Sequence, residues 1–432
     1  MFGLVDLSNF YASCEQTFRP SLRGKPVVVL GSNDGCVIAR SQEAKALGVP
    51  MGAPWFKVSH LAQSAGLVAL SANFPLIGDM SARFMSLAAG FGHQLEAYSV
   101  DEAFADLSGI PGDLTLRGFK IRARIRQWLG LECGVGLGGT KTLAKLANLV
   151  SKDAERKPGR YPAHLAGVCN FGDLSQAQLE AVMRATAVGD VWGVGRRYGA
   201  QLLELGVVSA WDLAQLPPSL VRKRWGLVLE RTVLELQGVS CIDLEAVPGP
   251  KKQVGVSRSF GKGLEGLDGL LEAVGEFAAR AAVKLRKQGS VAGQVFVFAQ
   301  TSPFRPPPHF SRGLCVPLAS ASADTRVLVA AAHAGVRAIF QSGVEFNKAG
   351  VFLLDLCPAN RRQEAFDFGE MGSEIDEQLM ATVDHLNQRF GRGTVLVGGA
   401  GNTRRKTDWS PKQSRLTPQY TTRLSDIPVA KA

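Results

Sequence analysis

The sequence predicts an α+β protein made of several domains. Short apolar runs rich in Val, Ile and Leu alternate with longer stretches whose apolar residues recur every three to four positions, the patterns of strands and helices. A chain of 432 residues also exceeds the length at which one hydrophobic core stops growing. The segment 171–237 has helical periodicity throughout, and a linker rich in Pro, Gly and Lys (247–252) follows it. We therefore expect sheet modules and one all-helical module.

The first third of the chain predicts a small αβ insertion within a larger unit. The chain opens with a strand at 2–6. The insertion, from 10 to about 73, then contains a helix at 10–18, a buried strand at 27–30, a short strand at 36–39 and a short helix at 41–47. The buried strand is the clearest, because four apolar residues follow one another without alternation. From residue 74 the larger unit resumes.

Helices and strands then alternate up to residue 162. Amphipathic patterns predict helices at 79–90, 113–129 and 140–152, and apolar runs predict strands around 98–107 and at 133–137. Beyond the linker we expect a β-α-β sheet module with two helices (267–287 and 324–341) and two strands (295–299 and 351–354). The tail from 358 contains one clear helix, 373–390, and is interpreted as an extended partner-binding segment.

Composition narrows the class of protein. The chain has 49 Lys and Arg against 38 Asp and Glu, a net charge of +11, which favours a polyanionic partner such as nucleic acid. Its seven cysteines are scattered without a CxxC pair, so we expect neither a zinc site nor a disulfide scaffold. The pattern suits reduced thiols in a cytosol. No signal peptide or membrane span is apparent. We expect a cytoplasmic protein without a membrane partner.

Three carboxylates stand at the ends of apolar runs. Asp101 and Glu102 separate two short runs, and Asp6 ends the run that opens the chain. If the strands end side by side, these groups can hold two Mg²⁺ ions, which prefer oxygen ligands and phosphate partners. An acidic hairpin turn with an unrelated Asp near the N-terminus fits the same residues.

A second feature lies in the helical segment, where a short turn precedes a helix. The turn and the first residues after it are Gly193, Val194, Gly195, Arg196 and Arg197. Backbone N–H groups at a helix N-terminus bind phosphate, and two arginines add charge. An ordinary αα-hairpin with a glycine turn is the alternative.

Many separated motifs occur in one order that resembles the Y family of translesion DNA polymerases. They are FYASCE (10–15), SVDEAF (99–104) and KTLAKLAN (141–148). Four further segments resemble the UmuC branch of that family, which comprises the catalytic subunit of bacterial DNA polymerase V and its plasmid-borne homologues: NDGCVIAR (33–40), SRSFG (257–261), TSPF (301–304) and PQYTTR (418–423). The resemblance covers residues 1 to about 425.

The resemblance implies a right-hand polymerase with an extended C-terminal tail. The palm is expected at 1–9 and 74–165, with the fingers at 10–73. The helical thumb, with its helix-hairpin-helix, is expected at 166–245 and the little finger at 250–356. A partner-binding tail (357–432) completes the chain. The implied activity is error-prone, DNA-templated DNA synthesis in the SOS response to DNA damage.

The resemblance also assigns the acids and the nucleotide site. Asp6, Asp101 and Glu102 become the catalytic residues, and with the Leu7 carbonyl they hold two Mg²⁺ ions for transfer of a dNTP to a primer 3′-OH. Tyr11 matches a steric gate against ribonucleotides. The remaining nucleotide-binding positions are Phe10, Arg40, Gln42, Lys45 and Lys152. The chain departs from the family at Gln42 and Lys45, where many members have Tyr and Arg, so a looser grip on the triphosphate is expected.

The implied partners follow from the UmuC branch. They are primer-template DNA, a cleaved UmuD-type dimer, a RecA filament and the sliding clamp. The DNA is expected to bind at the glycine turn, and the protein is expected to be associated with the nucleoid in the cytoplasm. A peptide with Gln363, Phe366 and Phe368 resembles a clamp-binding motif. Two other hypotheses stay open at this point: a palm-fold nucleotide cyclase, and a non-enzymatic DNA-bound regulator of recombination filaments.

Overall fold

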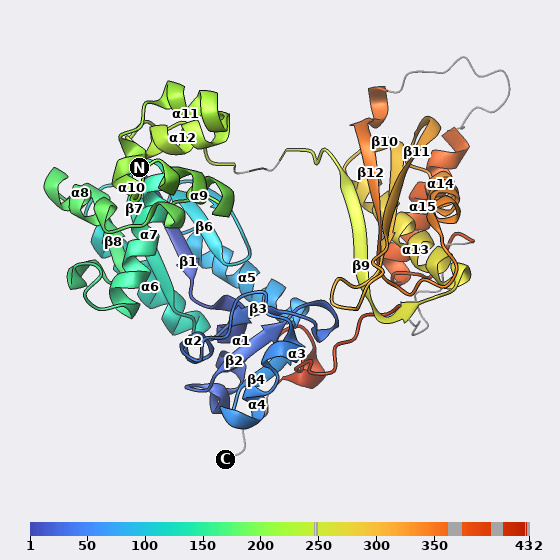
Figure 1. Cartoon of the computed structure of the whole chain (residues 1–432), viewed down its shortest axis with the longest axis horizontal. Helices are drawn as coiled ribbons and strands as arrows, with labels where there is room; N and C mark the ends of the chain where they lie inside the picture. The colour runs from blue at the N-terminus through green and yellow to red at the C-terminus, as the bar shows by residue number, and fades with distance from the viewer. Residues whose placement is uncertain (246, 248, 362–373, 399–408, 428, 430–432) are drawn as a thin grey trace. The chain divides into compact units, whose positions relative to one another are not determined.

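The computed structural model describes residues 1–245, 247, 249–361, 374–398, 409–427 and 429. It divides into two compact units (Figure 1). The first comprises Met1–Leu30, Val37–Pro248 and Leu416–Ala432, and the second comprises Gly31–Cys36 and Gly249–Arg415. The α+β multidomain class predicted from the sequence is confirmed.

A five-stranded sheet forms the centre of the first unit. Its order is β5-β6-β1-β7-β8, with bounds Leu95–Ala97 (β5), Glu102–Asp106 (β6), Phe2–Leu7 (β1), Cys133–Gly138 (β7) and Val168–Asn170 (β8). The central strand β1 pairs antiparallel with β6 and β7, whereas β7 and β8 run parallel. The first strand of the chain is therefore the innermost strand of this sheet.

Helices cover both faces of this sheet. Helices α5 (Phe74–Ala88) and α6 (Leu114–Leu129) pack against the face that presents Val5 and Val135. Helix α7 (Lys141–Arg156) covers the opposite face, where Ala144 meets Leu4. The approach of α7 requires glycine at position 136, because a Cβ there would lie 2.2 Å from the Ala144 carbonyl oxygen. Helix α7 continues four residues beyond the predicted end at 152.

Residues 10–73 fold as the predicted αβ insertion. Its three-stranded sheet has the order β3-β2-β4, with bounds Val37–Arg40, Val27–Leu30 and Val68–Ser71. Helix α1 (Phe10–Phe18) precedes this sheet in the chain, and three short helices follow within the insertion: α2 (Gln42–Ala46), α3 (Trp55–Val58) and α4 (Leu61–Ser64). All four residues of β2 are buried, as the unbroken apolar run predicted.

The segment 171–237 is helical, as predicted. Its helices are α8 (Gln176–Arg184), α9 (Arg196–Glu204), α10 (Ala210–Ala214), α11 (Pro218–Trp225) and α12 (Leu227–Leu236). They share a core with one side of α7, in which Leu143 and Val150 meet Val233 and neighbouring residues. Helix α7 thus connects the helical segment to the five-stranded sheet.

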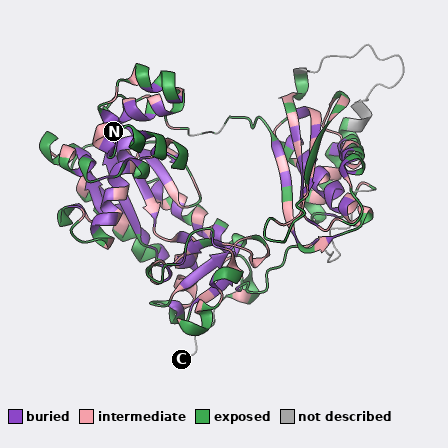
Figure 2. Cartoon of the chain, in the orientation of Figure 1, coloured by how far each residue is buried: buried purple, intermediate pink, exposed green. Residues whose placement is uncertain are grey.

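The second unit is an antiparallel four-stranded sheet backed by helices. Its order is β11-β10-β12-β9, with bounds Ser311–Ser322, Ser290–Gln300, Phe346–Pro358 and Val254–Leu264. Helices α13 (Leu267–Lys287) and α14 (Thr325–Ile339) cover one face, where the buried residues concentrate (Figure 2). The two predicted strands are longer than expected, and β9 and β11 join them.

Parts of the tail pack against folded structure. Helix α15 (Glu374–Phe390) is close to its predicted bounds, and Trp409 is buried against Phe277 in the second unit. The clamp-motif residues Gln363, Phe366 and Phe368 lie outside the described residues. Among the residues the structure describes, no helix is both long and apolar enough to cross a bilayer.

Candidate active site

The three predicted acids meet at one end of the central sheet. Asp6 and Glu102 are directly opposed in the β1–β6 register. The backbone N–H of Leu7 donates a hydrogen bond of 2.9 Å to the Asp101 carbonyl oxygen, which fixes the neighbouring acid at the same strand end. Residues nearly a hundred positions apart in sequence are thus brought together by strand pairing.

Strand alternation aims two of these carboxylates toward α7. Leu4 and Phe104 pack against Ala144 of this helix, and residues two apart in a strand share a face. Asp6 and Glu102 therefore point to the α7 side of the sheet. Ser99 holds the turn before β6, because its hydroxyl donates to Asp101 Oδ1 at 2.6 Å and accepts from the Glu102 backbone N–H at 3.1 Å.

Two lysines of α7 neutralise these carboxylates. Lys152 Nζ lies 2.5 Å from Asp6 Oδ2, and Lys145 Nζ lies 2.9 Å from Glu102 Oε2. The Lys152 stem passes over Gly134, the β7 partner of Asp6, where any Cβ would lie 2.7 Å from Lys152 Cγ. Glycine at this position therefore leaves room for the lysine to reach the acid.

The electrostatics of Asp6 reflect a site that needs positive charge. Burial is the main cause that raises the Asp6 pKa to about 6, and the charges of Glu102 and Asp101 raise it further against the opposing effect of Lys152. A cation beside these groups favours their ionised forms. The arrangement is that of a carboxylate cluster whose charge is only partly balanced by lysine.

The donor set fits a hard divalent cation. Its side-chain donors are carboxylate oxygens, and the Leu7 carbonyl adds a backbone oxygen, the ligand types that Mg²⁺ prefers. Among the described residues, no three acidic, His or Cys side chains are already arranged as a metal site. Lys152 and Lys145 each contact one oxygen of this donor set.

Helix α1 carries the predicted gate beside the acids. Phe10 is buried in the core that the five-stranded sheet forms with α5 and α6. Tyr11 contacts Phe10 edge to face at 5.9 Å. Burial and then the negative charge of Asp101 raise the pKa of the Tyr11 phenol, and this electrostatic effect links the gate to the acidic cluster.

The predicted triphosphate residues lie on three elements: Arg40 on β3, Gln42 and Lys45 on α2, and Lys152 on α7. Lys45 Nζ donates to Asn9 Oδ1 at 2.5 Å. Burial lowers the Lys45 pKa to about 8, and the nearby charges of Arg156, Arg40 and Lys152 lower it further. Arg40 Nη1 donates to the Val49 carbonyl oxygen. The positive charges that surround the Lys45 ammonium suit an anionic ligand.

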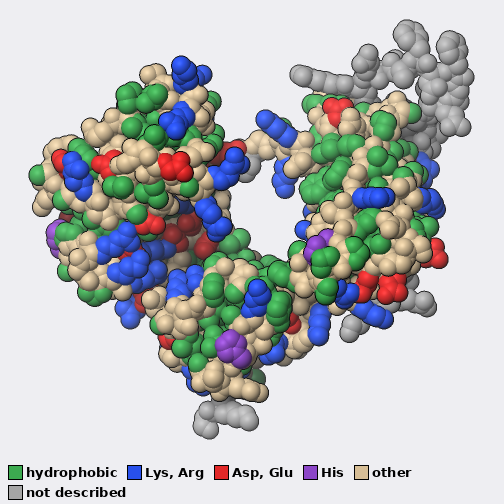
Figure 3. Space-filling model, in the orientation of Figure 1, with side chains coloured by type: hydrophobic (Ala, Val, Ile, Leu, Met, Phe, Trp, Pro, Cys, Tyr) green, Lys and Arg blue, Asp and Glu red, His purple; other side chains and the backbone are tan. Residues whose placement is uncertain are grey.

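Gln42 is placed differently from the other predicted triphosphate residues. It lines a pocket of about 960 Å³ with Ser8, Asn9 and Arg156. This pocket borders the cationic cluster, and Figure 3 shows basic side chains gathered where α6 and α7 approach α2. The amide of Gln42 thus lies at an edge of the site, and the positive charge at this pair of positions comes from Lys45.

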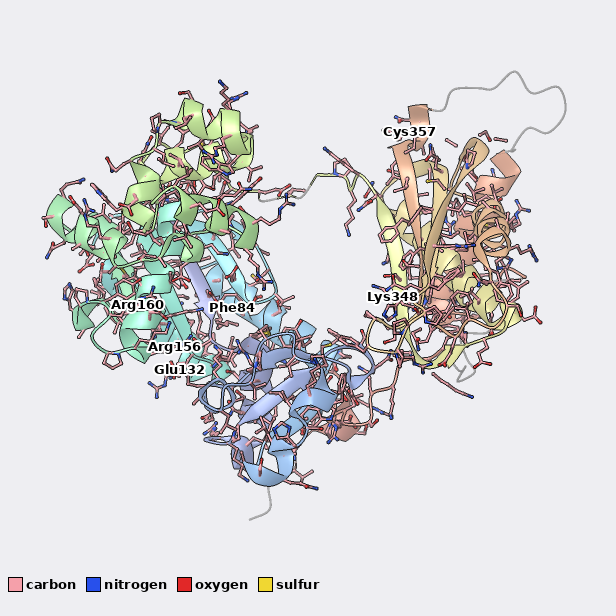
Figure 4. All side chains as sticks on the ribbon, viewed as in Figure 1. Phe84, Glu132, Arg156, Arg160, Lys348 and Cys357 are labelled. Carbon is pink, nitrogen blue, oxygen red and sulfur yellow. The ribbon has the colours of Figure 1, made fainter. Side chains whose placement is uncertain are left out.

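Arg156 was not anticipated from the sequence. Its Nη2 donates to Ser8 Oγ at 2.6 Å, directly after the strand that carries Asp6. Figure 4 shows Arg156 beside Glu132 at the α2 end of the palm helices. A helix continued through residue 156 would have revealed it, because Lys145, Lys152 and Arg156 recur at spacings of seven and four on one helical face.

The glycine turn begins a thumb helix as predicted. Gly193 has φ 91°, and Gly195 is the N-cap of α9. Arg196 and Arg197 are exposed in the first turn, while Val194 is buried. Trp192 Nε1 donates to the Tyr98 hydroxyl at 3.2 Å. The turn is therefore attached to the strand region beside the acids, a link that the sequence did not indicate.

Comparison with known proteins gives the family. The profile of the impB/mucB/samB family matches residues 5–148, and the profile of its C-terminal domain matches residues 251–366. The chain belongs to the impB/mucB/samB family. A domain of unknown function (DUF4113) matches residues 377–430.

Relatives of this family align along the whole chain. Protein ImpB of Salmonella typhimurium is 39% identical over 100% of both chains, and protein UmuC of S. typhimurium strain LT2 is 40% identical over 99% of both. DNA polymerase IV of Pelotomaculum thermopropionicum is 28% identical over 91% of this chain and 93% of its own.

Solved structures share the fold. A Y-family DNA polymerase chimera of Dbh and Dpo4 matches with a TM-score of 0.64 at 22% identity, covering 82% of this chain and 99% of the chimera. The insertion ternary complex of Dbh DNA polymerase matches with a TM-score of 0.52, over 82% and 98% of the two chains. The right-hand fold inferred from the resemblance is confirmed.

The family assignment selects among the three hypotheses. The chain is a Y-family DNA polymerase of the error-prone, translesion class. The nucleotide cyclase and the non-enzymatic regulator are not favoured. DNA polymerases of this type use divalent metal ions, DNA and dNTPs.

Proposed function

We propose that Asp6, Asp101 and Glu102 catalyse nucleotidyl transfer from a dNTP to a primer 3′-OH with two Mg²⁺ ions. The β1–β6 register carries this proposal, because it opposes Asp6 to Glu102 and bonds Leu7 to Asp101 at the same strand end. When bound, the two ions would activate the 3′-OH and neutralise charge on the triphosphate and the leaving pyrophosphate. Asp6, Asp101, Glu102 and the Leu7 carbonyl would hold these ions.

Lys152 and Lys145 would serve both the acidic cluster and the nucleotide. Without substrate, Lys152 and Lys145 balance carboxylate charge at 2.5 and 2.9 Å. With the metal ions bound, the Lys152 ammonium would be available to the triphosphate. Lys145 is also held over the Tyr98 ring at 4.2 Å, so it remains near Glu102 as a positioning group. One helix thus supplies both lysine functions.

Positive charge would hold the dNTP, and the shape of the site would exclude a ribonucleotide. Arg40, Lys45 and Lys152 would contact the triphosphate, with the α1 N-terminal backbone at Phe10. Gln42 would contribute a neutral hydrogen bond at the pocket edge. Tyr11 of α1 would occupy the space beneath the sugar, so a 2′-OH would clash with its ring.

The remaining parts follow the right-hand architecture. The palm would comprise 1–9 and 74–165, the fingers 10–73, the thumb 166–245 and the little finger 250–356, with a tail at 357–432. The backbone N–H groups after Gly193, with Arg196 and Arg197, would contact a phosphate of primer-template DNA. Exposure of both arginines supports this contact.

The similarity to UmuC along the whole chain supports partners of the same kind. We include a cleaved UmuD-type dimer, a RecA filament and the sliding clamp, the last through Gln363, Phe366 and Phe368. Action on chromosomal or plasmid DNA would place the protein at the nucleoid in the cytoplasm.

Primer extension opposite a template abasic site tests the proposal. The full chain is assayed with Mg²⁺ and dNTPs, alone and with a cleaved UmuD-type dimer and a RecA filament. Insertion opposite the lesion that requires Mg²⁺ and increases with the partners is expected. Loading of RecA filaments without any extension in either condition would instead favour the regulator hypothesis.

A further inference from the structure

A buried acid on the gate helix lies outside the catalytic cluster. Glu15 is four residues after Tyr11 on α1 and only 1% exposed. Its Oε1 accepts a hydrogen bond of 3.0 Å from the Thr417 hydroxyl, and its Oε2 has no hydrogen-bond partner among the described atoms. Burying a carboxylate is costly unless it is bonded, so the tail hydroxyl is an important contact for this group.

Thr417 also contacts Asn73, where the chain returns from the proposed fingers to the proposed palm. Asn73 is the N-cap of α5, and its Oδ1 accepts from the Leu76 backbone N–H. Its Nδ2 lies within hydrogen-bond distance of the Thr417 hydroxyl (3.0 Å), the Thr417 carbonyl (3.1 Å) and the Pro418 carbonyl (3.0 Å). Residues 9–10 and 73–74 are where the proposed fingers join the palm, so Thr417 bonds to elements at both crossings.

A third contact secures the far end of the gate helix. The Tyr420 ring stacks on Phe18, the last residue of α1, with centroids 5.2 Å apart and planes 6° apart. Thr417 itself is only 6% exposed. This segment is therefore docked through a buried hydrogen-bond network and an aromatic stack, in a manner specific to these side chains.

We propose that residues 417–420 form a tail clasp that positions α1, and with it Tyr11, relative to the palm. The proposal rests on the gate role proposed for Tyr11. It also assigns a task to the last part of the matched domain of unknown function, which spans 377–430. Thr417 is a positioning residue, because it contacts α1 and the α5 N-cap and not the nucleotide.

The clasp has a direct consequence for sugar selection. Loss of the Thr417 hydroxyl leaves Glu15 buried without the hydrogen bond at Oε1, and α1 must shift or open for that carboxylate to reach water. A displaced α1 moves Tyr11, and a 2′-OH then fits more readily. The chemistry at the acids does not use the clasp, so turnover of dNTPs should change little.

The test compares three threonine variants in the full chain. Thr417→Val keeps the shape and removes the hydroxyl, Thr417→Ser restores a hydroxyl, and Thr421→Val is the matched control because the buried Thr421 Oγ1 has no partner among the described atoms. Single-nucleotide insertion with dNTPs and rNTPs gives the discrimination ratio. Hydrogen exchange of residues 10–18 gives the order of α1.

We expect Thr417→Val to lower discrimination against ribonucleotides at least fivefold and to speed exchange in residues 10–18, with kcat for dNTPs within threefold. Thr417→Ser and Thr421→Val should stay within twofold of the unsubstituted chain on both measures. If Thr417→Val does not fold, Tyr420→Leu, which removes the stack on Phe18, takes its place with the same expected direction.

Tyr11→Ala separates the two proposals. If it relaxes sugar selection while Thr417→Val and Tyr420→Leu do not, the clasp is overturned and the gate stands. If Tyr11→Ala has no effect, the gate assignment fails and the exchange measurement decides alone: faster exchange in residues 10–18 supports the clasp, and unchanged exchange refutes it.

Discussion

Lys152 Nζ lies 2.5 Å from Asp6 Oδ2, across a strand position occupied by glycine. The pair joins α7 to the end of β1 at which the acidic cluster lies. We propose that this lysine both balances the Asp6 carboxylate and contacts the triphosphate, so one side chain would serve two roles.

Replacing Lys152 with Ala should mainly weaken nucleotide binding. A hydrogen bond to a charged group contributes about 1.5–3 kcal/mol, so we expect KM for dNTP to rise about tenfold or more with a smaller change in kcat. Steady-state insertion kinetics measure both. Lys157→Ala is the control, since Lys157 pairs with Asp153 on the same helix end; an equal effect of the two would remove Lys152 from the triphosphate site.

Arg156 should act as an additional triphosphate contact. Its guanidinium bonds to Ser8 and lowers the Lys45 pKa, so Arg156→Ala should raise KM for dNTP about five- to tenfold, in the range of one charged contact. Arg126→Ala is the control, because Arg126 lines the same pocket but pairs with Glu132. An unchanged KM for Arg156→Ala would restrict the nucleotide site to the residues predicted from the sequence.

Glu15 should make folding stability depend on pH. Burial raises its pKa to about 7 against the effects of Thr417 and Arg19, so the folded chain retains a proton that the unfolded chain releases near pH 4.5. The stability contribution is full below about pH 4.5 and is lost as pH rises toward 7. Glu15→Gln should therefore flatten this decline, by on the order of 2 kcal/mol.

Chemical unfolding at pH 5 and pH 8 measures this effect. Glu204→Gln is the control, because Glu204 is an exposed residue of α9. A decline between the two pH values that is the same in Glu15→Gln as in the unsubstituted chain would assign the pH dependence to other groups.

Neutralising Arg196 and Arg197 should weaken DNA binding without altering sequence preference. Each lost phosphate contact lowers the slope of log affinity against log salt by about one, so the double Ala variant should show a slope shallower by about two. Fluorescence anisotropy with a primer-template across a salt series measures it. Arg222→Ala, a thumb arginine paired with Glu230, is the control, and an unaltered slope in the double variant would place the DNA contact elsewhere.

Local sequence patterns could predict the acidic cluster and the main elements. Asp6 and Asp101-Glu102 stand at the ends of apolar runs, and strand pairing brings such ends together. Strand β11 escaped prediction because Pro317 lies within it and most of its residues are exposed, so no buried apolar run marks it. Arg156 escaped because the helix was expected to end at residue 152.

Contacts between distant segments could not be predicted from local patterns. Thr417 and Glu15 are 402 positions apart, and no local sequence pattern around either residue predicts this contact. The tail was interpreted as a partner-binding segment because it lacks long apolar runs. A few polar bonds and one aromatic stack suffice to dock it, and such contacts have no periodicity.

The central claim is that three acids share one metal-dependent active centre. The most direct test is primer extension by Asp101→Asn at saturating Mg²⁺ and dNTP, with Asp106→Asn at the other end of β6 as control. The account predicts a loss of about 10²–10³-fold or more, as for removal of a group that stabilises transition-state charge, with DNA affinity retained and Asp106→Asn unaffected. Extension by Asp101→Asn at the rate of the unsubstituted chain would contradict it.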